Sequence, residues 1–234
     1  MSTLTIRLPD DQYDRLKTLA ALTLASTSAR AQVAPTPPEI AAYTGLHKAA
    51  VKGDLAAAEM QTSSGANLYE RDGNGRTPFL VAAFARNTEI MAHFAKAGAD
   101  VNALDAQLYD AVTIAAVADD VQTLKAALAA GNTADNITSI YIGTALIAAA
   151  HLGHDEVVRI LIEAGAPLNH VNNLGWTALI EAVVLGDGGL RHQATVAHLV
   201  KAEADKSISD RNGATPLELA KQRGYAEIVK LLEE

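Results

Sequence analysis

The chain has 234 residues, no Cys, and 19 basic against 27 acidic side chains, which gives a formal net charge of -8. Hydrophobic residues make up 49% and aromatic residues 4%, a balance that favours closely packed helices over a thick sandwich core. Without Cys the chain has no disulfide, thiolate metal site or Cys nucleophile. The acidic balance makes nucleic-acid binding an unfavoured function, and no apolar run reaches the roughly 20 residues of a membrane span.

The first twenty residues carry one interpretable pattern. Residues 3–8 alternate polar and apolar side chains as a half-buried strand does, Pro9 ends the run, and two Asp residues can cap a following helix. This opening resembles ribbon-helix-helix antitoxins and repressors, in which outward strand residues enter the DNA major groove. The resemblance implies that role for Thr3, Thr5 and Arg7, but the Ser- and Pro-rich stretch that follows does not readily supply the second helix of that fold.

The same segment has a second interpretation, as an export signal. Arg15 and Lys17 precede a short apolar stretch, residues 19–25, and an Ala-Arg-Ala sequence at residues 29–31 matches an A-x-A cleavage site. Acidic residues before Arg15 are unusual for such a signal. We expect residues 1–31 to be an export signal and the protein to be periplasmic, with a cytoplasmic protein carrying a DNA-binding arm as the alternative.

Residues 32–39 are expected to form a Pro-rich lead-in. Three Pro residues lie between Val33 and Pro38, and a run so rich in Pro is expected to be extended and neither helix nor central strand. The repeat domain would then cover residues 40–234.

A recurring phrase organises the remaining chain. It reads Thr44-Gly-Leu-His-Lys-Ala-Ala50 and then Thr77-Pro-Phe-Leu-Val-Ala-Ala83, and a Gly follows 21 positions after the start in four copies. A Gly-His turn at Gly153-His154 falls between two helical patterns. The six copies are spaced by 33, 33, 34, 33 and 38 residues and start at Thr44, Thr77, Asp110, Thr144, Thr177 and Thr215.

This period and these motifs resemble ankyrin repeats over about residues 40–234. The resemblance implies an all-α solenoid of about six 33-residue helix-turn-helix units, joined by β-hairpin or loop fingers, with each Thr capping a first helix. The third unit departs most from the pattern, with Asp110 for Thr, Thr113 for His, and Ala118-Asp119-Asp120 where a Gly turn is expected.

No motif for catalysis or phosphate binding is present. His151 and His154 lie three positions apart, but His154 occupies the turn position where ankyrin repeats usually carry His. His47 occupies the matching place in the first phrase. We therefore predict structural hydrogen bonds for these rings, no metal, no cofactor, no catalytic residue and a non-enzymatic protein.

Ankyrin arrays recognise proteins through their finger tips and inner helices, so candidate contact residues are those that the repeat pattern does not prescribe. They comprise the residues directly before the recurring phrase, exposed positions of the inner helices, and neighbouring finger residues. The alternative for the aromatic members is that they pack between fingers. The candidates are Tyr43, Lys52, Arg76, Phe84, Tyr109, Tyr141, His151, Leu174, Trp176, Leu185, Arg191 and His192.

The last two candidates belong to an insertion of five residues in unit five. Three Gly residues between Leu185 and Leu190 predict a flexible loop with Arg191 and His192 at a polar tip, either functional or simply tolerated. The insertion and the phrase around Trp176 are similar to exported ankyrin-repeat proteins of proteobacteria. We expect a monomer that binds a partner protein along its concave face, or alternatively a cytoplasmic DNA-binding regulator with an ankyrin sensor array.

Overall fold

The computed structural model describes residues 33–234, and residues 1–31, with the predicted export signal or DNA-binding arm, lie outside the described part. The described residues contain 13 helices and form one compact unit, Ala34–Glu234. A short helix, α2 (Pro37–Ala42), precedes six helix pairs. The pairs are α3 (Gly45–Lys52) with α4 (Leu55–Ser63), α5 (Pro78–Phe84) with α6 (Thr88–Lys96), α7 (Ala111–Val117) with α8 (Val121–Ala129), α9 (Ala145–Leu152) with α10 (Asp155–Glu163), α11 (Ala178–Val184) with α12 (Leu190–Lys201), and α13 (Pro216–Arg223) with α14 (Ala226–Glu233).

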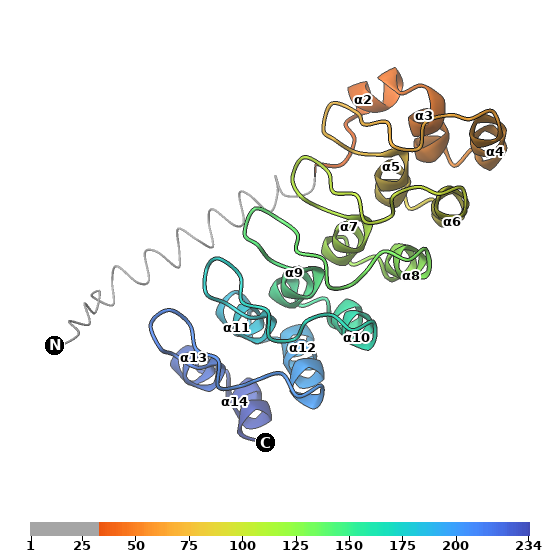
Figure 1. The fold of residues 1–234 in the computed structure, drawn as a ribbon. Helices are drawn as coiled ribbons and strands as arrows, with labels where there is room; N and C mark the ends of the chain where they lie inside the picture. Colours follow the sequence, from red (N-terminus) through yellow and green to blue (C-terminus); the bar gives the residue numbers. More distant parts are fainter. Residues whose placement is uncertain (1–32) are drawn as a thin grey trace. The chain divides into compact units, whose positions relative to one another are not determined.

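The six pairs stack side by side in two layers (Figure 1). The inner layer holds the first helix of each pair, and the outer layer holds the second. Each first helix packs against its own second helix and against the first helix of the next repeat. The predicted all-α solenoid of six helix-turn-helix units is therefore confirmed.

The residue before each inner helix explains where that helix begins. The Thr177 hydroxyl accepts the backbone N–H of Ile180 at 3.2 Å, and Thr77 and Thr144 cap their helices in the same way. In the irregular third unit the Asp110 carboxylate accepts the N–H of Thr113 at 2.8 Å, so Asp replaces Thr without loss of the cap. Each such cap stabilises its helix by about 1 kcal/mol.

Small side chains allow the layers to approach closely. Ala49, Ala82, Ala115, Ala149 and Ala182 are all fully or almost fully buried where neighbouring helices meet. Leu, Ile and Val residues of the same helices fill the remaining core, and every residue of α11 is buried. Burial of this apolar surface between neighbours is the main source of cohesion in a stacked array.

Two local expectations are corrected by the structure. The lead-in does not stay extended to Pro38, because Pro37 begins α2 and Thr36 with Glu39 forms a capping box around its first turn. Pro is compatible with that place because the first helical N–H groups need no partner within the helix. Of the two forms expected for the fingers, β-hairpin or loop, the structure has loops: within residues 33–234 the only β-bridge joins Thr138 to Gly143.

The second correction concerns the insertion in unit five. Residues 185–189 form a loop, but the segment from Leu190 onward is helical, so Arg191 and His192 lie in α12 and not at a loop tip, and α12 has 12 residues where α10 has 9. Arg191 lies in the first turn of α12 and forms ion pairs with Asp119 at 2.8 Å and Asp155 at 3.2 Å. The insertion therefore lengthens a helix and links repeats three, four and five.

Candidate protein-binding site

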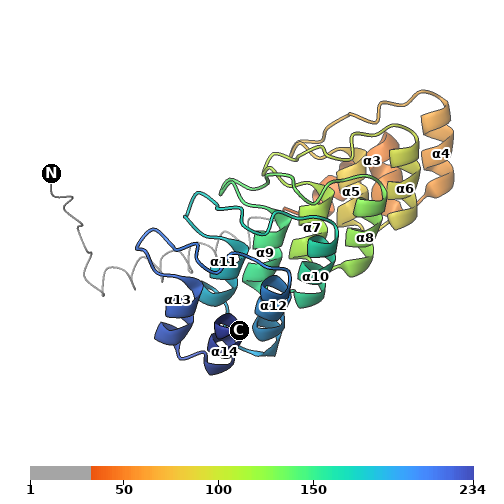
Figure 2. The same ribbon diagram turned by 60° about the horizontal axis from the view of Figure 1, so that its bottom comes forward.

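Five loops, here called fingers 1 to 5, join each outer helix to the next inner helix. Figure 2 shows them extending from one end of the helix pairs. Neighbouring fingers are joined by backbone hydrogen bonds of 2.9 Å: Ala106 N–H to Asn74 C=O, Ser139 N–H to Leu108 C=O, and Asn173 N–H to Tyr141 C=O. The fingers cover residues 64–77, 97–110, 130–144, 164–177 and 202–215. These bonds join fingers 1 to 4 into one continuous surface.

A side-chain oxygen shapes the turn inside four of the fingers. In finger 1, Asp72 Oδ1 accepts the N–H groups of Asn74 and Arg76, both at 2.9 Å. Asp105, Asn172 and Asp210 accept the matching pair of N–H groups in fingers 2, 4 and 5. Such Asx turns fix the loop conformation locally, so the finger tips are positioned by the sequence of each finger itself.

The position two residues before each inner-helix cap has a left-handed backbone. Gly occupies it in finger 1, finger 4 and finger 5, and the φ of Gly175 is +84°. In fingers 2 and 3 the residues are Leu108 and Ile142, with φ of +63° and +55°. A left-handed conformation costs about 1–2 kcal/mol for a residue with a Cβ, and it is rarest for β-branched side chains such as Ile.

Apolar side chains are exposed around these two strained residues. We call the set Leu108, Ile137, Ile140, Ile142 and Val171 the finger ridge; each side chain is between 44% and 61% exposed. The set spans fingers 2, 3 and 4, which the backbone bonds hold together. Exposed apolar residues gathered in this way mark interaction surfaces, whereas single exposed apolar residues are common.

None of the four predicted contact residues directly before the recurring phrase lies on this surface. Tyr109 and Trp176 are buried, at 7% and 9% exposure, so their placement agrees with the alternative in which such rings pack inside the array. Burial raises the pKa of Tyr109 to about 12. In the finger turn, the residue before the cap faces inward and the residue preceding it forms the exposed tip.

Among these residues, the prediction for Arg76 is the one that the structure contradicts most clearly. It was predicted to face a partner, but its side chain is fully buried and forms ion pairs with Asp72 at 2.7 Å and with Glu39 at 2.8 Å. The Tyr43 hydroxyl donates to the same Asp72 at 2.5 Å, so Tyr43 is also buried. The Arg76 charge therefore ties finger 1 to α2.

The electrostatics of this cluster follow from its burial. Burial opposes ionisation of Asp72, but hydrogen bonds from Tyr43 and Arg76 outweigh it and lower the pKa of Asp72. For Tyr43, burial and the bond to Asp72 both raise the pKa of the phenol above its ordinary value. Asp72 is therefore ionised and Tyr43 neutral at physiological pH.

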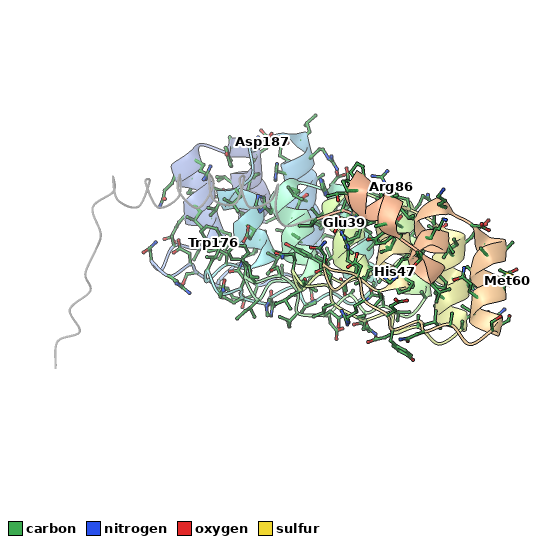
Figure 3. All side chains as sticks on the ribbon, turned by 90° about the horizontal axis from the view of Figure 1, so that it is seen from above. Glu39, His47, Met60, Arg86, Trp176 and Asp187 are labelled. Carbon is green, nitrogen blue, oxygen red and sulfur yellow. The ribbon has the colours of Figure 1, made fainter. Side chains whose placement is uncertain are left out.

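The other candidates fall into two groups. Arg191 is exposed but is engaged by Asp119 and Asp155, and His192 is buried with hydrogen bonds to Asp187 and to the His151 carbonyl, so the predicted polar tip is wrong. Figure 3 shows Asp187 on the side of the array away from Trp176 and the fingers. The inner-layer and finger candidates remain accessible: Lys52 is exposed, and Phe84, Tyr141, His151, Leu174 and Leu185 are half-buried.

The structural roles predicted for two histidines are confirmed. His47 Nε2 lies 2.9 Å from the Arg76 carbonyl, and His154 Nδ1 lies 2.8 Å from the Ala116 carbonyl in the previous repeat. Within the described part of the chain, no three His, Asp or Glu side chains are grouped so that they could hold a metal ion. None of the described helices is long and apolar enough to cross a membrane.

The finger ridge was missed in the sequence, although a signal for it exists. The predicted contact residues comprise inner-helix and neighbouring finger positions, together with those directly before the recurring phrase, where aromatic residues gather. One position earlier, the sequence reads Gly in three fingers but Leu108 and Ile142 in the other two. An apolar residue where the turn favours Gly indicates both strain and an exposed tip.

Comparisons with known proteins agree with this architecture. Residues 112–210 match a family model described as ankyrin repeats in three copies, and residues 46–94 match one described as ankyrin repeats in many copies. The ankyrin repeat protein YahD of Escherichia coli K12 is 33% identical over 185 residues, which are 79% of this chain and 92% of YahD.

Solved structures show the same arrangement. An ankyrin repeat domain, ABAYE2397, from Acinetobacter baumannii AYE is 43% identical, covers 80% of this chain and 95% of its own, and superposes with a TM-score of 0.76. A more distant neighbour, at 23% identity and a TM-score of 0.67, covers 82% of this chain and 97% of its own. It belongs to a complex of the Bd0816 predatory endopeptidase from Bdellovibrio bacteriovorus with the immunity protein Bd3460, and its likeness concerns the fold alone.

Proposed function

Because the chain belongs to the ankyrin-repeat family, whose members are generally non-enzymatic protein-interaction modules, we propose that it binds a partner protein through the finger ridge. The observation that carries the proposal is the pairing of exposure with strain in fingers 2 and 3. Leu108 and Ile142 are exposed apolar residues in left-handed positions where the other matching fingers have Gly. The strain at these tips gives no folding benefit that Gly would not give, so we assign it to binding.

The chemistry of the ridge defines the kind of partner. Its five residues carry no charge, and an uncharged apolar partner surface would lose the least hydration free energy on contact. In this proposal the half-buried Tyr141 and Leu174 of fingers 3 and 4 add to this surface, and Phe84 and Leu185 at the C-terminal ends of α5 and α11 are further candidate contacts. Lys52 and His151 are the polar groups that border the concave side in this proposal, where they would set orientation more than affinity.

The complex of a distant structural neighbour supports a partner that is itself a protein. That neighbour comes from an endopeptidase–immunity protein complex, and at its level of identity only the fold carries over. We infer from it no enzyme partner for this chain. The support is confined to the class of partner, a protein.

Substitution on the ridge tests the proposal. Ile140 is 61% exposed, so Ile140→Asp places a charge on the ridge at little cost to folding, and it should remove the captured partner from extracts of the producing organism. The matched control is Met60→Asp on the outer helix α4, where Met60 is 65% exposed (Figure 3). Capture unchanged by Ile140→Asp, or lost equally in both variants with circular dichroism intact, would reject the ridge as the binding surface.

We also propose that the protein acts in the periplasm. The support is the sequence of residues 15–31, with two basic residues, an apolar stretch and an Ala-Arg-Ala site. Intact-mass analysis of protein from separated cell fractions tests this: a periplasmic species that starts at Gln32 supports export. A cytoplasmic species that retains Met1 would refute it and make DNA binding by the ribbon-helix-helix-like segment the next function to test.

A further inference from the structure

Finger 4 departs from its neighbours at the residue that shapes its turn. Fingers 1, 2 and 5 use Asp72, Asp105 and Asp210, whereas finger 4 uses Asn172. Asn172 Oδ1 makes the usual bonds to the backbone N–H groups of Leu174 and Trp176, both at 3.0 Å. Its amide group is left to donate in another direction, which an Asp carboxylate cannot do.

That donor is directed at a buried carboxyl group. Asn172 Nδ2 donates to Glu181 Oε1 at 2.9 Å, and Glu181 lies on α11 with only 3% exposure. The other oxygen, Oε2, has no hydrogen-bond partner among the described residues and lies 3.5 Å from His151 Nδ1 on α9. Buried polar groups are normally hydrogen-bonded, so a carboxyl oxygen in this condition calls for an explanation.

The charged groups around Glu181 and His151 are engaged with other partners, so none of them neutralises a charge on Glu181. His192 of α12 binds Asp187 and the His151 carbonyl, and His154 binds the Ala116 carbonyl. Asp210 of finger 5 holds the backbone of its own finger. On α13, Glu218 caps Thr215, Lys221 pairs with Glu233, and Arg223 approaches Tyr225, all at the exposed surface. On α10, Asp155 pairs with Arg191, and Glu156 and Glu163 pair with Arg159.

We propose that Glu181, protonated beside a neutral His151, acts as a buried lock that holds finger 4 in place through Asn172. With the proton present the pair is neutral overall, and finger 4 keeps the position that sets Val171 on the finger ridge. Loss of the proton leaves an uncompensated buried carboxylate, which requires hydration and so opens the contact between α11 and finger 4. The consequence for partner binding rests on the proposed function, whereas the lock itself does not.

The directions of the two pKa shifts agree with a protonated Glu181 beside a neutral His151. Burial raises the pKa of Glu181 to about 8 against the bond from Asn172, and burial with His192 and His154 nearby lowers the pKa of His151 to about 4. Between these values the pair therefore holds one proton, on Glu181. Unfolded, the two groups would titrate near 4.5 and 6.5.

These shifts fix the sign of the pH dependence. The raised Glu181 pKa gives stability that is complete below pH 4.5 and is lost as pH rises toward 8; the lowered His151 pKa gives stability that is complete above pH 6.5 and is lost as pH falls toward 4. Between pH 4.5 and 6.5 the two trends cancel. Between pH 6.5 and 8.5 the Glu181 trend outweighs what remains of the His151 trend, and because each group is half-titrated near one end of the interval, the unfolding equilibrium constant should rise about tenfold.

The experiment follows the full chain by denaturant unfolding at pH 6.5 to 8.5 and by the native-state fluorescence of Trp176, the single Trp of the sequence, which lies in finger 4. Glu181→Gln should abolish the rise of about tenfold seen in the wild type and also the matching change in emission. Asn172→Asp should steepen the rise, and the pair Asn172→Asp with Glu181→Gln should restore a flat response, since Gln can donate to Asp. Asp210→Asn, at the same position in finger 5, is the control and should follow the wild type.

Two results would overturn the lock. Parallel pH curves for the wild type and Glu181→Gln would show that the pair holds no extra proton. A Trp176 emission that stays constant while the unfolding constant changes would show that finger 4 is not coupled to the pair. Neither readout uses a partner, so failure of the lock leaves the ridge proposal standing, and loss of the ridge proposal in the Ile140→Asp experiment leaves the lock standing.

Discussion

Ile142 and Gly175 occupy the same position in neighbouring fingers, and both have a left-handed backbone, with φ of +55° and +84°. The finger turn requires this conformation whichever residue is present. Gly adopts it without strain, whereas Ile places a β-branched side chain against its own backbone and exposes that side chain at the finger tip. The turn thus favours Gly at position 142, whereas the proposed binding surface favours the exposed apolar side chain of Ile142.

Replacement of the strained tip residues should stabilise the fold. Ile142→Gly and Leu108→Gly are each expected to raise the free energy of unfolding by about 1 kcal/mol, because relief of strain exceeds the greater entropy of Gly in the unfolded chain. Both variants should weaken partner capture. The control is Gly213→Ala in finger 5, where a Cβ meets nothing within 4 Å but φ is +80°, and it should lower stability by a similar amount. Lower stability in Ile142→Gly would contradict the assignment of strain.

The Trp176 ring should matter for folding rather than for binding. Trp176→Ala removes a large side chain that is 9% exposed, and it should lower the free energy of unfolding by about 3 kcal/mol. Ile140→Ala, on the exposed ridge, should change stability by less than about 0.5 kcal/mol. Denaturant titration compares the stability of the two variants. A Trp176→Ala protein that keeps its stability but no longer captures the partner would show that Trp176 belongs to the binding surface.

The buried Arg76 cluster should be essential to the first repeat. Arg76→Ala leaves Asp72 without its ion pair and detaches Glu39 of α2, and we expect a loss of about 3 kcal/mol. Arg191→Ala is the comparison at an exposed site. It removes two solvent-screened ion pairs and should lower the free energy of unfolding by less than about 1 kcal/mol in total. Because the Asp72 pKa is lowered in the folded state, the wild type should lose this stabilisation as pH falls below about 4, and Arg76→Ala should lose less.

The insertion in unit five should tolerate little change at its first Gly. A Cβ on Gly186 would lie 2.1 Å from the Ala182 carbonyl oxygen and 2.6 Å from the His192 ring, so Gly186→Ala should shift the start of α12 and lower stability by more than about 2 kcal/mol. Gly73→Ala is the control, since a Cβ there meets nothing within 4 Å. Equal thermal midpoints for the two variants would mean that the insertion is not packed as described.

The helices and their caps could be predicted because the residues that begin and end each helix lie within the same repeat. The 33-residue period located all six pairs, and even the irregular third unit kept its cap through Asp110 and its left-handed turn through Asp119, at φ +53°. The resemblance to ankyrin repeats supplied the stacking. Local sequence and a repeated pattern were sufficient for this part of the fold.

The features that escaped prediction depend on contacts between distant residues. Burial of Arg76 requires Glu39, 37 positions earlier and outside the repeat pattern. Arg191 at the start of α12 pairs with Asp119, 72 positions away, a contact that exists only once the repeats have stacked. Which finger residue is exposed depends on the backbone conformation of the turn. The aromatic residues directly before the recurring phrase suggested a binding position there, but the turn directs them inward.

Site-specific photocrosslinking in living cells tests the central claim most directly. A photoreactive amino acid placed at position 140 on the finger ridge should give a covalent adduct with one defined protein, whereas the same group at position 60 on α4 should not. Both positions are exposed in the isolated chain, so exposure alone cannot produce the difference. No adduct at position 140, or the same adducts at both positions, would contradict partner binding through the finger ridge.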